Sequence, residues 1–273
     1  MKSLLSVLLF FNITIYSQNT DTISTQDFPS FNHDLNSFFN TGKYILSAPS
    51  RFDNNDWITV GSIAALTGSA FLIDNELNKF WLKNKTEGLD KVSEIGRVYG
   101  EISFAAVFSG SLYLGGKLFG EKDISLTGRM LLEGLFYAGL TTTVIKTITG
   151  RSRPFTNEGD FKFRFFQTKN DFTSFPSGHT TVAFTLSTIL SERINNPYAS
   201  IVLYTLASST VWQRMYSNNH WLSDTLLGAS IGYFIGKAVV KAESDLISES
   251  KNNFYMAPSL SEGFLTININ YSF

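Results

Sequence analysis

Long apolar stretches, broken by short polar segments, fill the middle of this chain. Apolar residues recur there at three- and four-residue intervals and predict helices over 57–73, 89–119, 130–148, 177–194 and 198–213, with a further helix opening near residue 220. Asn55 or Asp56 would cap the first of these helices. Helices joined by short connections pack antiparallel, so the pattern predicts an all-α fold, an antiparallel bundle of about six core helices.

The two ends of the chain have different patterns. Residues 1–17 carry a lysine and an apolar run that ends at Ser17, which is typical of a secretory signal peptide; an uncleaved anchor is the alternative. Residues 18–56 are polar without periodicity and predict a linker or extended arm. In 246–273, alternation of apolar and polar residues predicts a short C-terminal β-hairpin, with Phe254–Pro258 as one strand and the turn at Ser259–Gly263. The helical domain is accordingly placed at 57–245.

Charged and hydroxyl residues gather at the predicted helix ends. They form three groups: Lys146, Arg153 and Pro154; then Pro176, Ser177, Gly178 and His179; then Arg214, His220 and Asp224. Alternate helices of an antiparallel bundle end and begin on the same side, so the three groups are expected to meet. His220 and Asp224 are four residues apart, which lets the carboxylate accept the imidazole Nδ1 proton. Three cations, a hydroxyl and the N–H groups of a helix N-terminus predict a pocket for a phosphoryl group.

The three groups in this order resemble the type 2 phosphatidic acid phosphatase (PAP2) superfamily, which also holds bacterial acid phosphatases and vanadium haloperoxidases. The shared pattern is Lys, six residues, Arg-Pro; then Pro-Ser-Gly-His; then Arg, five residues, His, three residues, Asp, within roughly residues 57–240. The resemblance implies that His220 is a nucleophile forming a phosphohistidine, that Asp224 orients it, and that His179 protonates the leaving oxygen. It implies phosphate binding by Lys146, Arg153, Ser177, Gly178 and Arg214. Gln213 departs from the pattern, because the family usually has serine there.

The resemblance to the bacterial phosphatase branch implies a metal-independent phosphatase with no cofactor. A lipid phosphate or prenyl diphosphate is the favoured substrate, because the apolar helices would bring the site to a membrane surface. Three alternatives stay open: an acid phosphatase of soluble phosphomonoesters, a vanadium-dependent haloperoxidase, and a non-catalytic envelope protein. For the peroxidase the chain is short, and with only three histidines it offers none for a halide pocket.

Composition excludes several other classes of protein. The formal net charge is −1 and no basic tract is present, which argues against a nucleic-acid partner. The chain has no cysteine, so disulfides and thiolate metal sites are excluded. No clustered Asp and Glu residues of the kind that hold Mg²⁺ with substrate phosphates are evident, and the three cations can neutralise a phosphate themselves.

The relation of the chain to a membrane is left open by the pattern. Several predicted helices have 15 to 19 apolar residues, near the roughly 20 that span a bilayer, yet the mean hydropathy is only +0.02 and Glu133 lies within the third helix. We expect a membrane-associated protein of the cell envelope with a periplasm-facing site; the number of spans and the choice of inner or outer membrane stay open. Phe161, Phe163 and Phe165 alternate with cations and predict either contact with an acyl or prenyl tail or a packed loop.

Overall fold

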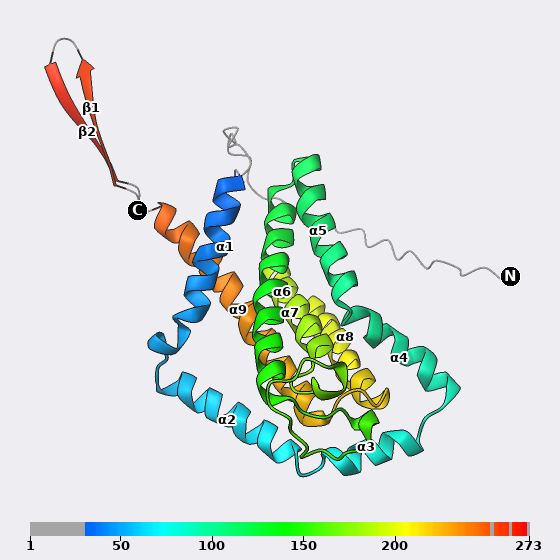
Figure 1. The fold of residues 1–273 in the computed structure, drawn as a ribbon. Helices are drawn as coiled ribbons and strands as arrows, with labels where there is room; N and C mark the ends of the chain where they lie inside the picture. Colours follow the sequence, from blue (N-terminus) through cyan, green and yellow to red (C-terminus); the bar gives the residue numbers. More distant parts are fainter. Residues whose placement is uncertain (1–30, 252–253, 262–263, 272–273) are drawn as a thin grey trace.

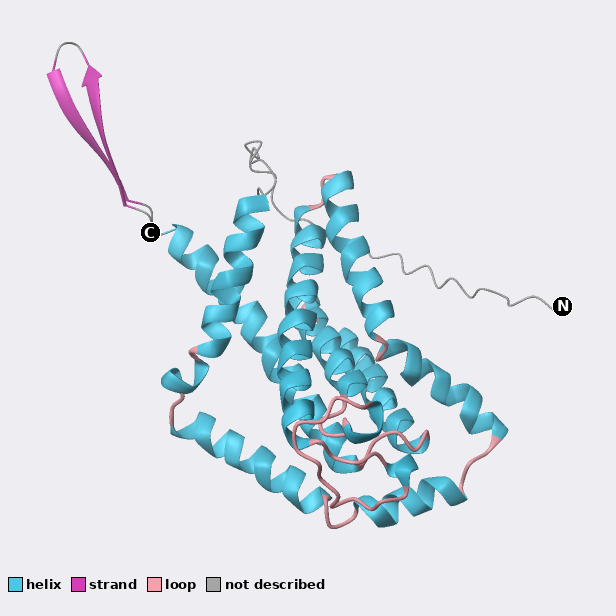
Figure 2. Ribbon diagram, in the orientation of Figure 1, coloured by secondary structure: helices cyan, strands magenta, loops and turns pink. Residues whose placement is uncertain are grey.

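A computed structural model describes residues 31–251, 254–261 and 264–271. Its helical part runs as a chain of α-helices joined by short loops, apart from one long loop between α6 and α7 (Figure 1, Figure 2). The helices are α1 (Phe31–Leu46), α2 (Asn54–Ala70), α3 (Asp74–Lys83), α4 (Glu87–Tyr99), α5 (Ile102–Phe119), α6 (Lys122–Thr149), α7 (Gly178–Ile194), α8 (Pro197–Tyr216) and α9 (Leu222–Lys251).

The core lies where α6, α7 and α9 pack together, with α5 against α6 and α8 against α7. Its buried side chains come from four helices and include Ala105, Met130, Leu131, Leu135, Leu186, Ile189 and Val239. Close approach of α7 and α9 depends on glycines at four-residue intervals: a Cβ at Gly228 would lie 2.5 Å from Ser177 O, and one at Gly232 would lie 2.4 Å from Thr181 O. The start of α7 is therefore held against the first turns of α9.

The predicted antiparallel helical bundle is present, but its helix count was too low. The described residues contain nine α-helices rather than about six, partly because the predicted helix 89–119 is two helices, α4 and α5, separated at Gly100 and Glu101. Helix α6 starts at Lys122, two turns before the predicted start. Helix α2 is capped by Asp53, whose side chain accepts from Asp56 N, and not by Asn55 or Asp56.

The prediction of a linker or extended arm is wrong for part of its range. Residues 31–46 form α1, which packs on α6 and α9 and is anchored by hydrogen bonds from Ser37 to Glu243 and from Thr41 to Glu133. Its partners are distant in the chain, so local polarity hid the helix. The predicted signal peptide at residues 1–17 lies outside the described residues.

The predicted C-terminal β-hairpin does not belong to the helical fold, which corrects the predicted fold class. Within residues 31–251 the domain is built from helices, and no strand contributes to its core. Residues Phe254–Ser261 and Phe264–Tyr271 pair as β1 and β2 beyond the end of α9, away from the bundle (Figure 1). The turn predicted at Ser259–Gly263 is misplaced, since β1 continues through Ser261. The alternation of apolar and polar residues predicts extended strands. It does not indicate whether those strands pack on the helical domain.

Two segments of the described chain meet the length and composition of a membrane span. Helix α5 does so alone, with a mean hydropathy of 1.3, and α2 with α3 does so as a pair bent by 55°. Many large apolar side chains on the outer faces of α2, α5, α6 and α8 are exposed, including Ile58, Val107, Phe136, Leu140 and Ile201. An apolar outer surface of this extent is typical of proteins that contact a membrane or a partner.

Candidate active site

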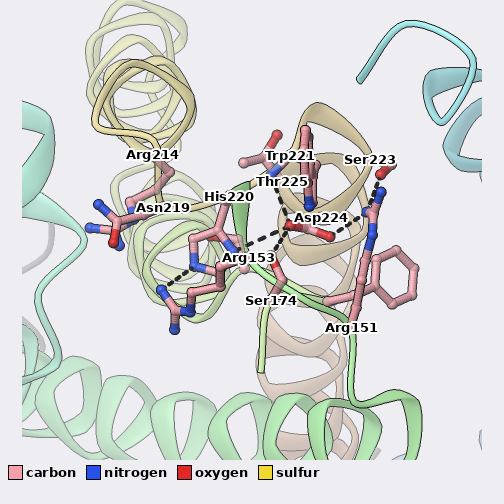
Figure 3. A network of polar contacts seen from close by, with 12 residues as sticks. Arg151, Arg153, Ser174, Arg214, Asn219, His220, Trp221, Ser223, Asp224 and Thr225 are labelled. Atoms are coloured by element: carbon pink, nitrogen blue, oxygen red, sulfur yellow. Dashed lines mark hydrogen bonds and ion pairs between the residues drawn. The ribbon is translucent and has the colours of Figure 1, made fainter. Parts of the chain in front are cut away.

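The three groups of predicted site residues meet at one end of the bundle. Lys146 lies in the last turn of α6, Arg214 in the last turns of α8, and Gly178 and His179 in the first turn of α7. Arg153 comes from the loop after α6, and His220 from the loop that precedes α9. Figure 3 shows Arg153 reaching the His220 ring, to which a dashed line joins it, with Arg214 nearby. The expectation that antiparallel packing brings these groups together is confirmed by this geometry.

The His220 ring is held between a cation and a carboxylate. Its Nδ1 lies 3.4 Å from Asp224 Oδ2, and its Nε2 lies 3.5 Å from Arg153 Nη1 (Figure 3). The ring is 2% exposed, and burial with nearby cations lowers the pKa of His220 well below its usual value. A neutral imidazole with its proton on Nδ1 can accept from Arg153 and keeps a lone pair on Nε2. Helix α9 starts at Leu222, so His220 lies just before the helix and not on the predicted shared face.

Asp224 is buried and bound on both oxygens. Ser174 Oγ donates to Oδ2 at 2.5 Å and the backbone N–H of Trp221 donates to the same oxygen at 2.8 Å. Arg151 Nη1 donates to Oδ1 at 2.6 Å. Burial raises the pKa of Asp224, but the Arg151 charge and these hydrogen bonds outweigh it, so the pKa is lowered overall. The carboxylate is therefore ionised and fixed in orientation.

The three cations of the site are bound by neutral groups. Lys146 Nζ donates to Thr173 O at 2.5 Å, Arg153 Nε to Asn170 O at 2.8 Å, and Arg214 Nη1 to Gln213 Oε1 at 3.4 Å. Within residues 31–251, none of the three forms an ion pair, and the buried Nε of Arg214 has no hydrogen-bond partner. Buried guanidinium and ammonium groups without carboxylates are costly, so this arrangement favours an anion as the missing partner.

Burial and mutual repulsion lower the pKa of these cations. Burial lowers the pKa of Lys146 to about 7, and the charge of Arg153 adds to the effect. Burial and Arg153 lower the pKa of Arg214 to about 10. A bound phosphoryl dianion would reverse these shifts, because it stabilises each charged form.

The N-terminus of α7 faces the same space. Ser177 is fully buried, and its backbone N–H donates to Asp224 O at 2.9 Å, which fixes the start of the helix against the first turn of α9. A Cβ at Gly178 would lie 3.7 Å from Lys146 Cε, so the open N–H of this turn and the Lys146 side chain border one volume. The helix dipole favours an anion there.

His179 is paired with a carboxylate that the sequence did not suggest. Its Nε2 lies 3.2 Å from Glu101 Oε2, and Glu101 comes from the break between α4 and α5. Burial, followed by the Arg214 charge, lowers the pKa of His179 to about 4 in spite of this carboxylate. The close approach of this break to α7 depends on Gly100, where a Cβ would lie 2.9 Å from His179 O. Its one sequence signal was a glycine inside an apolar helical pattern.

Two further predictions concern the surroundings of the site. Pro154 is buried at the start of a short 3-10 turn, and Pro176 immediately precedes the α7 cap, so both shape the loop that supplies the site. In the aromatic loop, the rings of Phe161 and Phe163 lie 5.6 and 6.3 Å from that of Phe71. Phe163 is half-buried there, in agreement with the packed-loop alternative, whereas Phe161 is still 65% exposed. Phe165 is 67% exposed and leaves that layer.

A large apolar cavity lies elsewhere in the molecule. It has a volume of about 910 Å³ between α1, α2 and α9, and its lining includes Ile63, Phe71, Phe175, Ile231 and Phe234. None of the three cations lines it, so the cavity and the cation cluster are separate features.

Parts of this chain are similar to known proteins. Residues 128–247 match the family model described as the PAP2 superfamily. The chain is 40% identical to the lipid A 1-phosphatase of Porphyromonas gingivalis over 81 residues, which are 28% of this chain and 18% of that protein. It is 24% identical to the lipid A 4'-phosphatase of the same organism over 123 residues, 44% of this chain and 52% of that protein. The chain thus spans about half or less of the length of these relatives.

Two solved structures resemble this chain in fold. Aquifex aeolicus LpxE aligns with a TM-score of 0.49 and 21% identity, covering 62% of this chain and 95% of that one. A transmembrane PAP2-type phosphatidylglycerolphosphate phosphatase from Bacillus subtilis aligns with a TM-score of 0.48 and 21% identity, covering 78% and 96%.

Proposed function

Because residues 128–247 match the PAP2 superfamily model, we propose that the chain is a phosphatase that removes a phosphoryl group from a phosphorylated lipid without a metal ion or cofactor. The observation that carries the proposal is the group of three buried cations, Lys146, Arg153 and Arg214, which carry no carboxylate partner among the described residues. Beside them lies the His220 imidazole, whose Nε2 is 3.5 Å from Arg153 Nη1, too far for a strong hydrogen bond, and carries the lone pair that would attack phosphorus.

The first step forms a bond between His220 Nε2 and phosphorus while the bond from phosphorus to the lipid oxygen breaks. Asp224 stabilises the positive charge that develops on the ring. The departing oxygen takes its proton from His179, which must therefore be protonated in the complex. The pKa of His179 is about 4 without ligand, chiefly through burial and Arg214. A phosphoryl dianion neutralises Arg214, and Glu101 then favours the protonated ring.

The second step reverses the roles. Water attacks phosphorus, the bond to His220 Nε2 breaks, and His179, left neutral by the first step, takes a proton from that water. The cations stabilise charge on the non-bridging oxygens in both steps. Such electrostatic stabilisation is worth about 10²- to 10³-fold in rate for each well-placed donor.

A lipid substrate accounts for the apolar outer surface. Exposed side chains such as Val107, Leu118 and Leu140 give α5 and α6 a surface that water solvates poorly. The matched relatives act on lipid A, according to their names, and a phosphorylated glycolipid is the first substrate to test. Phosphatidic acid, phosphatidylglycerophosphate, a prenyl diphosphate and a soluble ester complete the panel.

The test is phosphate release by the purified full-length chain from each member of this panel, in the presence of a chelator. We expect release from one or more lipids, inhibition by vanadate, and an acid-labile phosphoprotein in quenched reactions. His220→Ala should abolish both release and phosphoprotein, whereas His33→Ala, in α1, serves as the matched control. Near-normal turnover in His220→Ala, or dependence on added Mg²⁺, would contradict the proposed mechanism.

The site is proposed to face the periplasm, on the basis of the N-terminal pattern of residues 1–17. Asn170 is exposed in the loop that supplies the site, and the chain has no native cysteine. Asn170→Cys should therefore react with a membrane-impermeant thiol reagent in intact spheroplasts. Reaction only after lysis would place the site in the cytoplasm.

A further inference from the structure

Beyond the predicted residues, a buried ion network lies directly behind Asp224. Arg151 is 0% exposed and sits between two carboxylates: Nη1 donates to Asp224 Oδ1 at 2.6 Å and Nη2 donates to Asp74 Oδ2 at 2.8 Å. Nη1 also donates to Ser223 Oγ at 2.6 Å, and Ser223 in turn donates to Asp74 through its hydroxyl and its backbone N–H. Figure 3 shows the guanidinium on the side of Asp224 away from His220.

The network is sealed from water by aromatic rings. The guanidinium carbon of Arg151 lies 4.1 Å from the ring centroid of Phe71, 5.5 Å from that of Trp221 and 5.9 Å from that of Phe175. Charges in such surroundings interact far more strongly than at a surface. The planar guanidinium also holds its N–H donors in fixed directions, so it sets the orientation of each carboxylate as well as its distance.

The network joins parts of the chain that are distant in sequence. Asp74 opens α3, Arg151 follows α6, and Asp224 lies in the first turn of α9. Arg151 can satisfy both carboxylates at once because its two terminal nitrogens point to different elements. The carboxylate that lies 3.4 Å from His220 Nδ1 is thus itself linked to α3 through one residue, Arg151.

We propose that Arg151, supported by Asp74, is a positioning residue that holds the Asp224 carboxylate so that His220 keeps its proton on Nδ1 and its lone pair on Nε2. This inference rests on the proposed function of the site, but it makes a separate statement about the state of His220. It predicts that loss of Arg151 lowers kcat and leaves phosphate binding by the cations nearly unchanged.

The difficulty is that removal of Arg151 leaves Asp74 and Asp224 as buried carboxylates without their cation, which can unfold the domain. The double variant Arg151→Met with Asp74→Asn removes one charge of each sign and retains the net charge of the network. It should recover the thermal stability lost in Arg151→Met. Asp224 still lacks its cation in the double variant, so we expect kcat to stay at least tenfold below that of the unmodified chain.

A pH profile separates positioning from simple structural support. The Arg151 charge is among the causes that lower the pKa of Asp224, so its loss raises that pKa and Asp224 becomes protonated at higher pH. The acid limb of kcat should therefore move to higher pH in the double variant. Arg151→Lys retains the positive charge but not the planar pair of N–H donors, and it should have a higher kcat than Arg151→Met. Arg164→Met is the matched control, since Arg164 lies in the same loop and pairs with the exposed Glu158.

The decisive measurement reads the histidine directly in the full-length chain. With ¹⁵N-labelled histidine, the three rings of the chain are assignable by single substitution, and His220 should carry its proton on Nδ1. In the double variant we expect a mixture of tautomers, with unchanged affinity for inorganic phosphate. An unchanged His220 tautomer together with unchanged kcat overturns the positioning role. Absence of turnover on every substrate would refute the proposed function alone, because the tautomer measurement does not require activity.

Discussion

The two ends of the helical bundle hold buried charge in opposite ways. Where α1 packs on α6 and α9, Arg129 forms ion pairs with three carboxylates, at 3.5 Å with Asp34, 2.8 Å with Glu133 and 2.7 Å with Glu243. At the other end, the three cations of the site bind backbone carbonyls and an amide. The cation of the first cluster is paired with carboxylates of the protein, whereas the cations of the second cluster have neutral partners. The difference teaches that pairing, not the presence of buried charge, separates structural support from a binding site.

The largest expected effect is on stability, at the paired end. Arg129→Met leaves Glu133 and Glu243 without their cation, while Asp34 keeps Lys117, and it should destabilise the fold by about 3–5 kcal/mol. Denaturant unfolding in detergent measures this change. Arg193→Met is the control, because Arg193 pairs with the exposed Asp123 and should cost less than about 1 kcal/mol. Equal losses in the two variants would contradict the structural role of the paired cluster.

At the other end the same type of change should act on function instead. Arg214→Met removes a cation that repels its neighbours, so the unfolding free energy should stay the same or rise. Loss of one stabilising donor should lower kcat/KM for phosphate release by about 10²- to 10³-fold. If Arg214→Met loses as much stability as Arg129→Met and retains its kcat/KM, the proposed difference between the two ends is contradicted.

Titration of Lys146 gives a smaller effect. Burial lowers its pKa to about 7, so above that pH the free site has lost this charge, and binding an anion must take up a proton. The affinity for sulfate, which stays a dianion throughout, should therefore fall about tenfold per pH unit above pH 7. Lys146→Arg should flatten this dependence, because arginine stays charged. Calorimetric titration between pH 6 and 9 tests the difference, and an equal slope in both proteins would show that another group titrates.

The smallest effect concerns Gln213, a neutral neighbour of Arg214. Its contact with Nη1 is long, at 3.4 Å, and a weak hydrogen bond contributes little. Gln213→Ser should therefore change kcat/KM by no more than about threefold. A larger loss would mean that the amide acts as a true partner of Arg214, so that this cation is less available to phosphate.

The helix ends that carry the site could be predicted from sequence because each is marked locally. Gly150 ends α6 in a left-handed conformation, with φ of 57°, and Ser177 stands at the cap position of α7. Antiparallel packing then brings those ends together without any further information. The phosphate-binding and catalytic roles of the eight predicted site residues remain predictions.

The missed residues share a physical cause. Asp74 and Arg151 lie 77 positions apart, and Glu101 lies 78 positions from His179, so no local pattern relates them. Helix α1 was missed for the same reason, since its polar residues look solvated until Glu133 and Glu243 are brought to them. Local sequence patterns predicted the secondary structure of most segments. The partner of each buried charge depends on contacts between distant segments, which those patterns do not contain.

The hydrogen bond from Ser37 to Glu243 joins residues 206 positions apart, which has a consequence for biosynthesis. Helix α1 leaves the ribosome early, but a carboxylate that locks it is made near the end of the described helical chain. At about 5–20 residues per second, the delay is roughly 10–40 s. Of the described helices, α1 is made first and is therefore among the last to be locked in place. A chain that stops before α9 leaves it without that anchor.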